Sequence, residues 1–215
     1  MTLYLGLNKQ TAKKYQADFL PILRVSPYSL NCPQLRKASK YLEKSTHVII
    51  TSPSSTSLFI SKMKRAHSLR SLREKYYICI GQATEQRLKN LVPKAKIITA
   101  KEETSEGIVP ILKSCSRDCY FLYPHSALSR PIIKKFLQEE HRKHFAYAHY
   151  NVRPVALSVR VFGKYKNIIL TSPSGVRAYA RIFPNLPNKH HWCLGPITFN
   201  EFKKIYNHPP LLFSN

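Results

Sequence analysis

The sequence has few acidic residues for its length. Its 215 residues include 11 Asp and Glu against 35 Lys and Arg, which gives a formal net charge of +24. A surface of this sign attracts polyanions and repels cations, so the expected partner is a nucleic acid or a small molecule with many carboxylates. The basic residues are spread along the chain and form no tail or Arg-Gly tract, which argues against a disordered basic arm.

Long hydrophobic runs and regularly spaced cysteines are also missing. No apolar stretch approaches the length of a membrane span, and residues 1–7 read as a first strand and not as a signal peptide. Five scattered cysteines suit a reducing compartment. Neither Cys115 with Cys119 nor the segment 190–193 has the spacing of a zinc site. We therefore expect a cytoplasmic protein with no membrane segment and no metal.

One strand-to-helix junction occurs twice, about half a chain apart. Residues 49–54 read IITSPS and residues 169–174 read ILTSPS. In each copy an apolar strand leads to a serine that suits a helix N-cap, Ser52 or Ser172, and then to a proline that suits the first helical position. A single copy would be an ordinary helix start. Two copies favour a function, because the amide groups and dipole at a helix start bind carboxylate or phosphate.

A second pair of related motifs follows these junctions in the same order. Residues 81–84 read GQAT after an apolar strand, and residues 195–198 read GPIT after another. A glycine at a strand end lets a ligand approach the backbone closely. Repeated motifs in one order predict two lobes of similar fold, and open α/β sheets bind ligands beyond the carboxyl ends of their strands. The residues expected to face one cleft between the lobes are Ser52, Gly81, Thr84, Ser172, Gly195 and Thr198.

Strand and helix patterns alternate along nearly the whole chain, which is typical of an α/β protein. The expected strands are residues 3–7, 22–25, 47–51, 76–80, 95–99, 119–123, 144–153, 167–171, 191–194 and 210–213. The expected helices are residues 10–19, 33–43, 54–65, 69–75, 82–90, a segment after Thr104, 129–141, 174–182 and 197–206.

The uneven distribution of these strands predicts a discontinuous first lobe. Residues 30–145 hold enough strands for one complete flavodoxin-like lobe with a parallel sheet, whereas residues 1–22 and 155–215 each hold part of another. The chain is expected to begin lobe one, build lobe two and return. The two crossings, residues 23–29 and 146–154, are extended and marked by proline, and are expected to pair as a two-stranded hinge.

Seven short motifs carry a resemblance to a known family. They lie, in the family's order, at residues 20–23, 51–54, 81–84, 122–125, 147–151, 171–176 and 194–198. Over nearly its whole length the chain resembles the uroporphyrinogen-III synthase (HemD) family, which implies the same bilobed, hinge-linked fold. The resemblance also implies a hydro-lyase of haem and other tetrapyrrole biosynthesis. Such an enzyme closes hydroxymethylbilane with loss of water and inversion of the terminal ring, which gives uroporphyrinogen III.

The resemblance also implies roles for single residues. Tyr150 matches the tyrosine that is proposed in the family to protonate the departing hydroxyl, with Tyr147 and His149 as neighbouring alternatives. Many members have two threonines after Gly-Pro, whereas this chain has Ile197 at the first of these positions. No cofactor is expected. We expect a monomer that could contact the upstream deaminase transiently, with no nucleic-acid partner. The positions expected to bind or position the substrate are Ser52, Gly81, Thr84, Ser172, Gly195 and Thr198.

Two other functions stay open from the residues alone. The charge would suit a basic nucleic-acid-binding protein, although the sequence has no recognition motif of the common modules and no stacking pattern of aromatic residues. Two lobes without catalysis would suit a small-ligand-binding protein. The isomer that forms from hydroxymethylbilane would separate these three functions.

Overall fold

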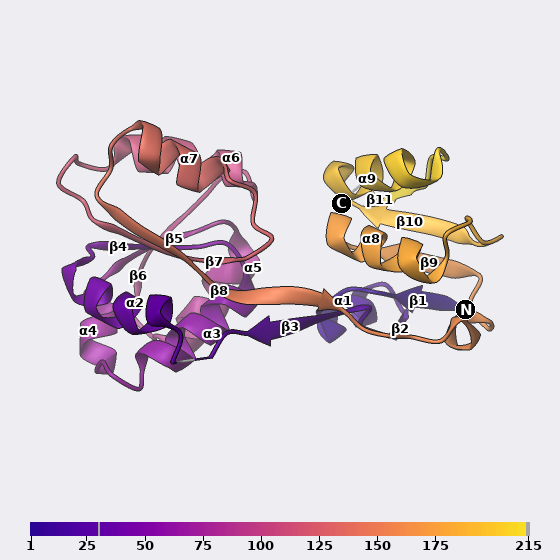
Figure 1. Ribbon diagram of the computed structural model, residues 1–215, viewed down its shortest axis with the longest axis horizontal. Helices are drawn as coiled ribbons and strands as arrows, with labels where there is room; N and C mark the ends of the chain where they lie inside the picture. Colours follow the sequence, from indigo (N-terminus) through magenta and orange to yellow (C-terminus); the bar gives the residue numbers. More distant parts are fainter. Residues whose placement is uncertain (30, 214–215) are drawn as a thin grey trace. The chain divides into compact units, whose positions relative to one another are not determined.

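The computed structural model describes residues 1–29 and 31–213, which divide into two compact units (Figure 1). Unit 1 combines the two ends of the chain, Met1–Arg24 and Val152–Asn215, and unit 2 is the continuous segment Val25–Asn151. Leu30, where lobe two was predicted to begin, lies outside the described residues, as do residues 214–215 of the predicted lobe one. The predicted α/β class with largely parallel sheets is confirmed.

Unit 2 is built on a six-stranded sheet in the order β3-β8-β7-β4-β5-β6. From β8 to β6 all the pairings are parallel. Strand β4, in the interior of the sheet, is buried along its whole length, as expected for a parallel strand that is covered on both faces. The strands are β3 (Leu23–Pro27), β4 (His47–Ile50), β5 (Tyr76–Cys79), β6 (Lys96–Thr99), β7 (Phe121–Ser126) and β8 (His144–Pro154).

Two layers of helices cover this sheet. One face packs against α2 (Pro33–Lys44), α3 (Pro53–Met63), α4 (Leu69–Arg73) and α5 (Gln82–Leu91). The other face packs against α6 (Ser105–Ser114) and α7 (Ile132–Glu139), which lie together on one side of the sheet in Figure 1. The cores on the two faces hold the sheet between them, so the strand ends are the places left for a site.

Unit 1 has a five-stranded, all-parallel sheet in the order β11-β10-β9-β1-β2. One face packs against α8 (Pro173–Ile182), α9 (Pro196–Tyr206) and the 3₁₀ turn η1 (Val159–Phe162), and the other against α1 (Lys9–Lys14). The strands are β1 (Thr2–Tyr4), β2 (Asp18–Phe19), β9 (Asn167–Leu170), β10 (His190–Leu194) and β11 (Leu211–Phe213).

The five strands of the unit 1 sheet match five neighbouring strands of the unit 2 sheet in space, but the chain passes through them in a different order. When β11-β10-β9-β1-β2 is aligned with β6-β5-β4-β7-β8, β9 matches β4 and β10 matches β5. Unit 1 is therefore a circular permutation of unit 2. In both sheets the strand order reverses beside the first of these matched strands, between β4 and β7 and between β9 and β1. Such a switch point is where doubly wound sheets bind ligands, and each Ser-Pro junction follows it directly.

The N-terminal segment differs from the sequence prediction. The helix expected at residues 10–19 is wrong in its second half, because α1 ends at Lys14 and Gln16 turns the chain with a φ of 49°. Residues 18–19 then pair with β1 as β2. The strand expected at residues 22–25 is confirmed with bounds shifted by one and two residues, since β3 spans Leu23–Pro27, and it lies at the edge of the unit 2 sheet. Tyr15 and Phe19 pack with Tyr4 under the sheet, and this tertiary packing outweighs the helical pattern.

The two crossings between the units are extended, as the prolines predict. Residues 23–27 form β3, which lies beside β8 in the sheet order. The hydrogen bond from the Tyr28 amide to the His149 carbonyl, at 3.1 Å, joins the two segments. Their role as a hinge, and the lobe boundaries at residues 22, 30, 145 and 155, stay predictions. Among the described residues no helix combines the length and the apolar character needed to span a membrane.

Candidate active site

The Ser-Pro junction of unit 2 begins α3 as predicted. Ser52 is the N-cap, and its Oγ accepts a hydrogen bond from the Ser55 amide at 3.0 Å. Pro53 occupies the first helical position. The Ser52 hydroxyl also lies 3.2 Å from the hydroxyl of Tyr150. The start of α3 and the predicted catalytic tyrosine therefore meet at the switch point of this sheet.

The junction of unit 1 repeats this cap without the tyrosine contact. Ser172 caps α8 and accepts a hydrogen bond from the Gly175 amide at 3.2 Å. Its hydroxyl lies 3.2 Å from that of Ser174. A Cβ at Gly175 would stand 3.3 Å from the Ser172 Oγ, which is a tight contact. Glycine at this position therefore leaves room for the capping hydroxyl.

Gly81 stands at the start of α5, where a carboxylate of the protein itself is bound. The Glu103 carboxylate accepts a hydrogen bond from the Gln82 amide at 2.8 Å. A Cβ at Gly81 would overlap the Glu103 carboxyl group. The absence of a side chain at residue 81 thus leaves room for a carboxylate against the helix start, which is the geometry that helix N-termini offer to anions.

Gly195 holds the matching place at the start of α9. Its φ of 82° lies in the left-handed region that favours glycine. Among the described residues other than its chain neighbours, no group lies within 4 Å of the position that a Cβ would take. Ile197, which replaces the first threonine of the family pattern, is 48% exposed.

The two predicted threonines are less accessible than the glycines before them. Thr84 is 2% exposed and Thr198 is 3% exposed. Each lies in the first turn of its helix, α5 or α9, with its side chain turned into the unit. A substrate group would reach either hydroxyl only after a rearrangement, and their place in the site stays a prediction.

Tyr150 is buried within β8 and remains protonated at neutral pH. It is 5% exposed, and burial raises the pKa of its phenol. Hydrogen bonds with the Ser52 and Ser126 hydroxyls oppose this effect, because they lower the same pKa. The protonated form is the one that a general acid needs.

The two alternative acids lie deeper in unit 2. Tyr147 packs in the core with Leu122 and Phe145, burial raises its pKa, and its hydroxyl has no partner among the described residues. His149 is fully buried, and burial lowers its pKa to about 3, with a further contribution from the charge of Lys62. His149 is therefore neutral at physiological pH. Of the three, Tyr150 is the residue whose polar group reaches a Ser-Pro junction.

The predicted site residues form one set in each unit. Strands β4 and β5 are neighbours, so the Ser52 and Gly81 loops leave adjacent strand ends, and β9 and β10 place the Ser172 and Gly195 loops in the same way. The expectation that the two sets face one cleft stays a prediction. Sequence reasoning missed Ser55, Ser126 and Glu103. Ser55 was within reach of the sequence, because it stands three residues after the N-cap, where a capping hydrogen bond ends.

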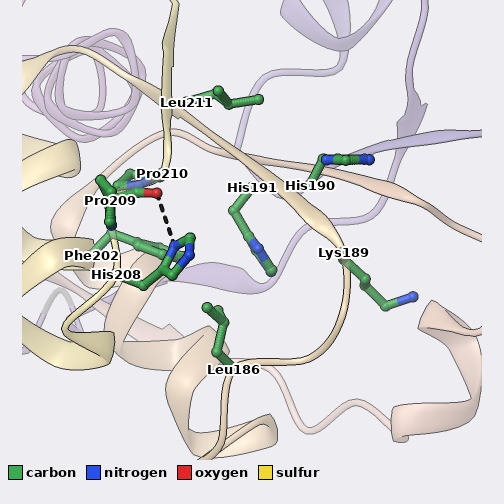
Figure 2. Close-up of a pocket in the computed structure, with 9 residues that line it drawn as sticks. All are labelled: Leu186, Lys189, His190, His191, Phe202, His208, Pro209, Pro210 and Leu211. Carbon is green, nitrogen blue, oxygen red and sulfur yellow. Dashed lines mark hydrogen bonds between the residues drawn. The ribbon is translucent and has the colours of Figure 1, made fainter.

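A cavity of about 200 Å³ in unit 1 lies beside the amino-terminal end of β10, whereas Gly195 follows the carboxyl-terminal end of that strand (Figure 2). Figure 2 shows His191 from the start of β10 and His208 from the loop before β11 beside this cavity. His191 is buried, and its Nε2 lies 3.1 Å from the Tyr179 hydroxyl. The other lining residues are Leu186, Lys189, His190, Phe202, Pro209, Pro210 and Leu211, so the predicted site residues take no part in it.

Metal-binding side chains do not gather in the described part of the chain. Within it, no group of three or more His, Cys, Asp or Glu residues could hold a metal ion. The polar groups at the strand ends of unit 2 are instead hydroxyls, amides and one carboxylate, which suit binding of anions and proton transfer.

The fold and these strand-end loops define a class: a doubly wound α/β protein with a serine-capped helix start at the switch point of each of two units. The model of the uroporphyrinogen-III synthase HemD family matches residues 8–209. The chain therefore belongs to the uroporphyrinogen-III synthase family, and it is an enzyme of tetrapyrrole biosynthesis that acts on a small-molecule substrate.

Solved structures show the same fold. The uroporphyrinogen-III synthetase of Helicobacter pylori 26695 has a TM-score of 0.70 at 16% identity, with 98% of this chain and 91% of that chain covered. A mutant uroporphyrinogen III synthase of the extremely thermophilic bacterium Thermus thermophilus has a TM-score of 0.65 at 13% identity, with 99% and 92% covered. A search of curated proteins finds no match. The sequence has thus diverged widely while the fold is kept.

Proposed function

We propose that Tyr150 is the general acid with which this enzyme closes hydroxymethylbilane to uroporphyrinogen III. The observation that carries the proposal is the 3.2 Å contact between the Tyr150 and Ser52 hydroxyls at the switch point of unit 2. This contact joins a proton donor to a helix start that suits a substrate carboxylate.

In the proposed step, the bond between the terminal carbon of the bilane and its hydroxyl oxygen breaks. The oxygen takes the Tyr150 proton and leaves as water, and the pyrrole nitrogen stabilises the cation that remains. The substituted α-carbon of the pyrrole at the other end of the bilane attacks this cation and gives a spirocyclic intermediate. The bond from that α-carbon to its bridge carbon then breaks, and the free α-carbon of the same pyrrole bonds to the bridge carbon, which closes the macrocycle with this ring inverted. The proton that this second α-carbon loses returns to the phenolate. A phenol with a pKa near 10 is a weak acid. Hydrogen bonds with Ser52 and Ser126 lower its pKa and so ease the transfer.

The substrate is held, in this proposal, by its acetate and propionate groups. The starts of α3 and α5 in unit 2 and of α8 and α9 in unit 1 supply backbone amides and dipoles for these carboxylates. The Glu103 carboxylate on the Gln82 amide supports this role for α5. The residues proposed to bind the substrate are Ser52, Gly81, Thr84, Ser172, Gly195 and Thr198.

The setting of the enzyme is part of the proposal. We infer that it works as a monomer in the cytoplasm and meets the upstream deaminase transiently. Residues 1–22 with 155–215 form lobe one and residues 30–145 form lobe two. The crossings at residues 23–29 and 146–154 serve as a hinge that lets the lobes move during turnover.

Replacement of Tyr150 by phenylalanine tests the proposed acid. The Tyr150→Phe change removes one hydroxyl and should lower kcat by roughly 10²-fold with KM nearly unchanged, the low end for loss of a general acid. The rate of type III synthesis from fresh hydroxymethylbilane measures both constants. Tyr147→Phe is the matched control, and it should leave kcat within about twofold because its hydroxyl lies in the core. A Tyr150→Phe enzyme with undiminished type III synthesis would show that another group supplies the proton.

A further inference from the structure

Tyr150 follows a break in the pairing of β7 with β8. His125 pairs with Ala148, but the next residue, Ser126, pairs with Tyr150. His149 is thus the extra residue of a β-bulge, because it has no partner of its own between His125 and Ser126 of β7. A bulge changes the face to which the following side chain points, and bulges recur beside active sites for this reason. Here the residue whose direction is set is the proposed acid.

The side chain of His149 is fixed to the first turn of α3. Its Nε2 lies 2.9 Å from the Ser55 Oγ, and Ser55 in turn donates to the Pro124 carbonyl at 3.2 Å. Because the Ser55 proton is used there, His149 donates from Nε2 and keeps a lone pair on Nδ1. The amide of Ser55 donates to Ser52, the residue that meets Tyr150. One helical turn therefore links His149 to the hydroxyl that Tyr150 contacts.

The backbone of His149 is held from the other side. Its carbonyl accepts hydrogen bonds from the Tyr28 amide at 3.1 Å and from the Lys62 Nζ at 3.2 Å. The next carbonyl, that of Tyr150, accepts from the Ala127 amide at 2.9 Å. The bulge is therefore fixed at its side chain and at two successive carbonyls, which leaves Tyr150 little freedom to turn.

A histidine is a costly residue in this place. His149 is fully buried, and its Nδ1 has no partner among the described residues. An unpaired buried polar atom destabilises the folded state, and an apolar residue of similar size would avoid this loss. Packing alone therefore does not explain the histidine, whereas the hydrogen bond to Ser55 does.

We propose that His149 is a positioning residue that aims the Tyr150 hydroxyl at the start of α3, through the bulge in β8 and its hydrogen bond to Ser55. The effect of His149 on the rate rests on the proposed role of Tyr150 as the acid. The effect of His149 on the direction of the Tyr150 ring does not depend on that role.

Two substitutions of similar size separate the hydrogen bond from packing. His149→Gln keeps an N–H donor near the place of Nε2, and His149→Met removes it. His149→Met should lower kcat by roughly 10-fold to 100-fold, the loss that follows a displacement of about 1 Å, with KM within about twofold. His149→Gln should keep most of the activity. In a Tyr150→Phe background, His149→Met should have no further effect on kcat, because it acts through the phenol.

A readout without substrate follows the Tyr150 ring directly. In protein labelled with ¹³C at the tyrosine ring, the Tyr150 signal is assigned by its loss in Tyr150→Phe. Its shift and titration should change in His149→Met and in Ser55→Ala, and return toward those of the natural protein in His149→Gln. Ser55→Ala removes the same hydrogen bond with less change of volume, so it serves if His149→Met does not fold.

A matched control comes from the other unit. His191, which Figure 2 shows beside the cavity of unit 1, is also a buried histidine within hydrogen-bond distance of a hydroxyl, that of Tyr179. It lies at the start of β10, whereas Gly195 follows the end of that strand. His191→Met should lower Tm and leave kcat unchanged. If His149→Met likewise lowers only Tm, with kcat and the Tyr150 signal unchanged, the positioning role is overturned. If Tyr150→Phe is fully active but the Tyr150 signal still responds to His149, the proposed acid fails and the positioning stands.

Discussion

At the scale of single residues, environment separates chemically similar groups. Three neighbouring residues of β8 carry polar groups that could donate a proton. The Tyr147 hydroxyl lies in the core, the His149 ring is bonded to Ser55, and the Tyr150 hydroxyl meets the N-cap of α3. The chemistry proposed for Tyr150 follows from this placement, since the intrinsic acidity of the two tyrosines is the same.

Glu103 is the second residue whose placement suggests an experiment. Its carboxylate occupies the start of α5, where a substrate carboxylate is proposed to bind. Glu103→Ala frees the Gln82 amide, so KM for hydroxymethylbilane should fall roughly fivefold, the effect of a hydrogen bond worth about 1 kcal/mol. Steady-state kinetics at fixed salt measure the change.

Glu102→Ala is the control for charge, since it removes one negative charge from the adjacent exposed residue. It should change KM less than Glu103→Ala does. Equal effects of the two changes would mean that net charge alone is responsible. A rise in KM for Glu103→Ala would show that its carboxylate supports the loop and does not compete with the substrate.

At the scale of elements, the sequence predicts most helices and strands because their signals are local. The Ser-Pro pairs begin α3 and α8 where the N-cap rule places them, and apolar runs such as residues 48–50 form buried strands. The failure at residues 10–19 has a non-local cause. The pairing of residues 18–19 with β1 and the packing of Phe19 depend on strands that the local pattern does not contain.

The candidate site could be predicted from the sequence only in part. The N-cap hydroxyls and the glycines at strand ends follow from local rules, and Tyr150 follows from a resemblance in motif order. The bulge at His149 depends on the register between β7 and β8, and the Glu103 contact joins residues 21 positions apart. Neither leaves a local signal. The burial of Thr84 and Thr198 likewise depends on how their helices pack.

At the scale of the whole molecule, charge and substrate are complementary. The chain carries a formal charge of +24, and hydroxymethylbilane carries an acetate and a propionate on each ring. Opposite charges of this size steer encounter, and salt screens them over a Debye length of about 10 Å at 0.1 M. Raising salt from about 0.05 to 0.5 M should therefore lower kcat/KM by roughly tenfold and leave kcat within about twofold.

Initial rates across a salt series, at substrate concentrations below and above KM, measure the two constants. A neutral osmolyte at matched osmolality is the control, and it should change neither constant in this way. A parallel fall in kcat and kcat/KM would point to salt acting on the folded protein, and a flat kcat/KM would exclude steering.

The identity of the product tests the account most directly. Freshly made hydroxymethylbilane closes without an enzyme to the uninverted type I isomer, so the isomer formed reports whether the protein controls the reaction. We predict that the purified protein yields uroporphyrinogen III well above the spontaneous rate of closure, as measured by chromatographic separation of the oxidised isomers. Type I product formed at the spontaneous rate would contradict the account.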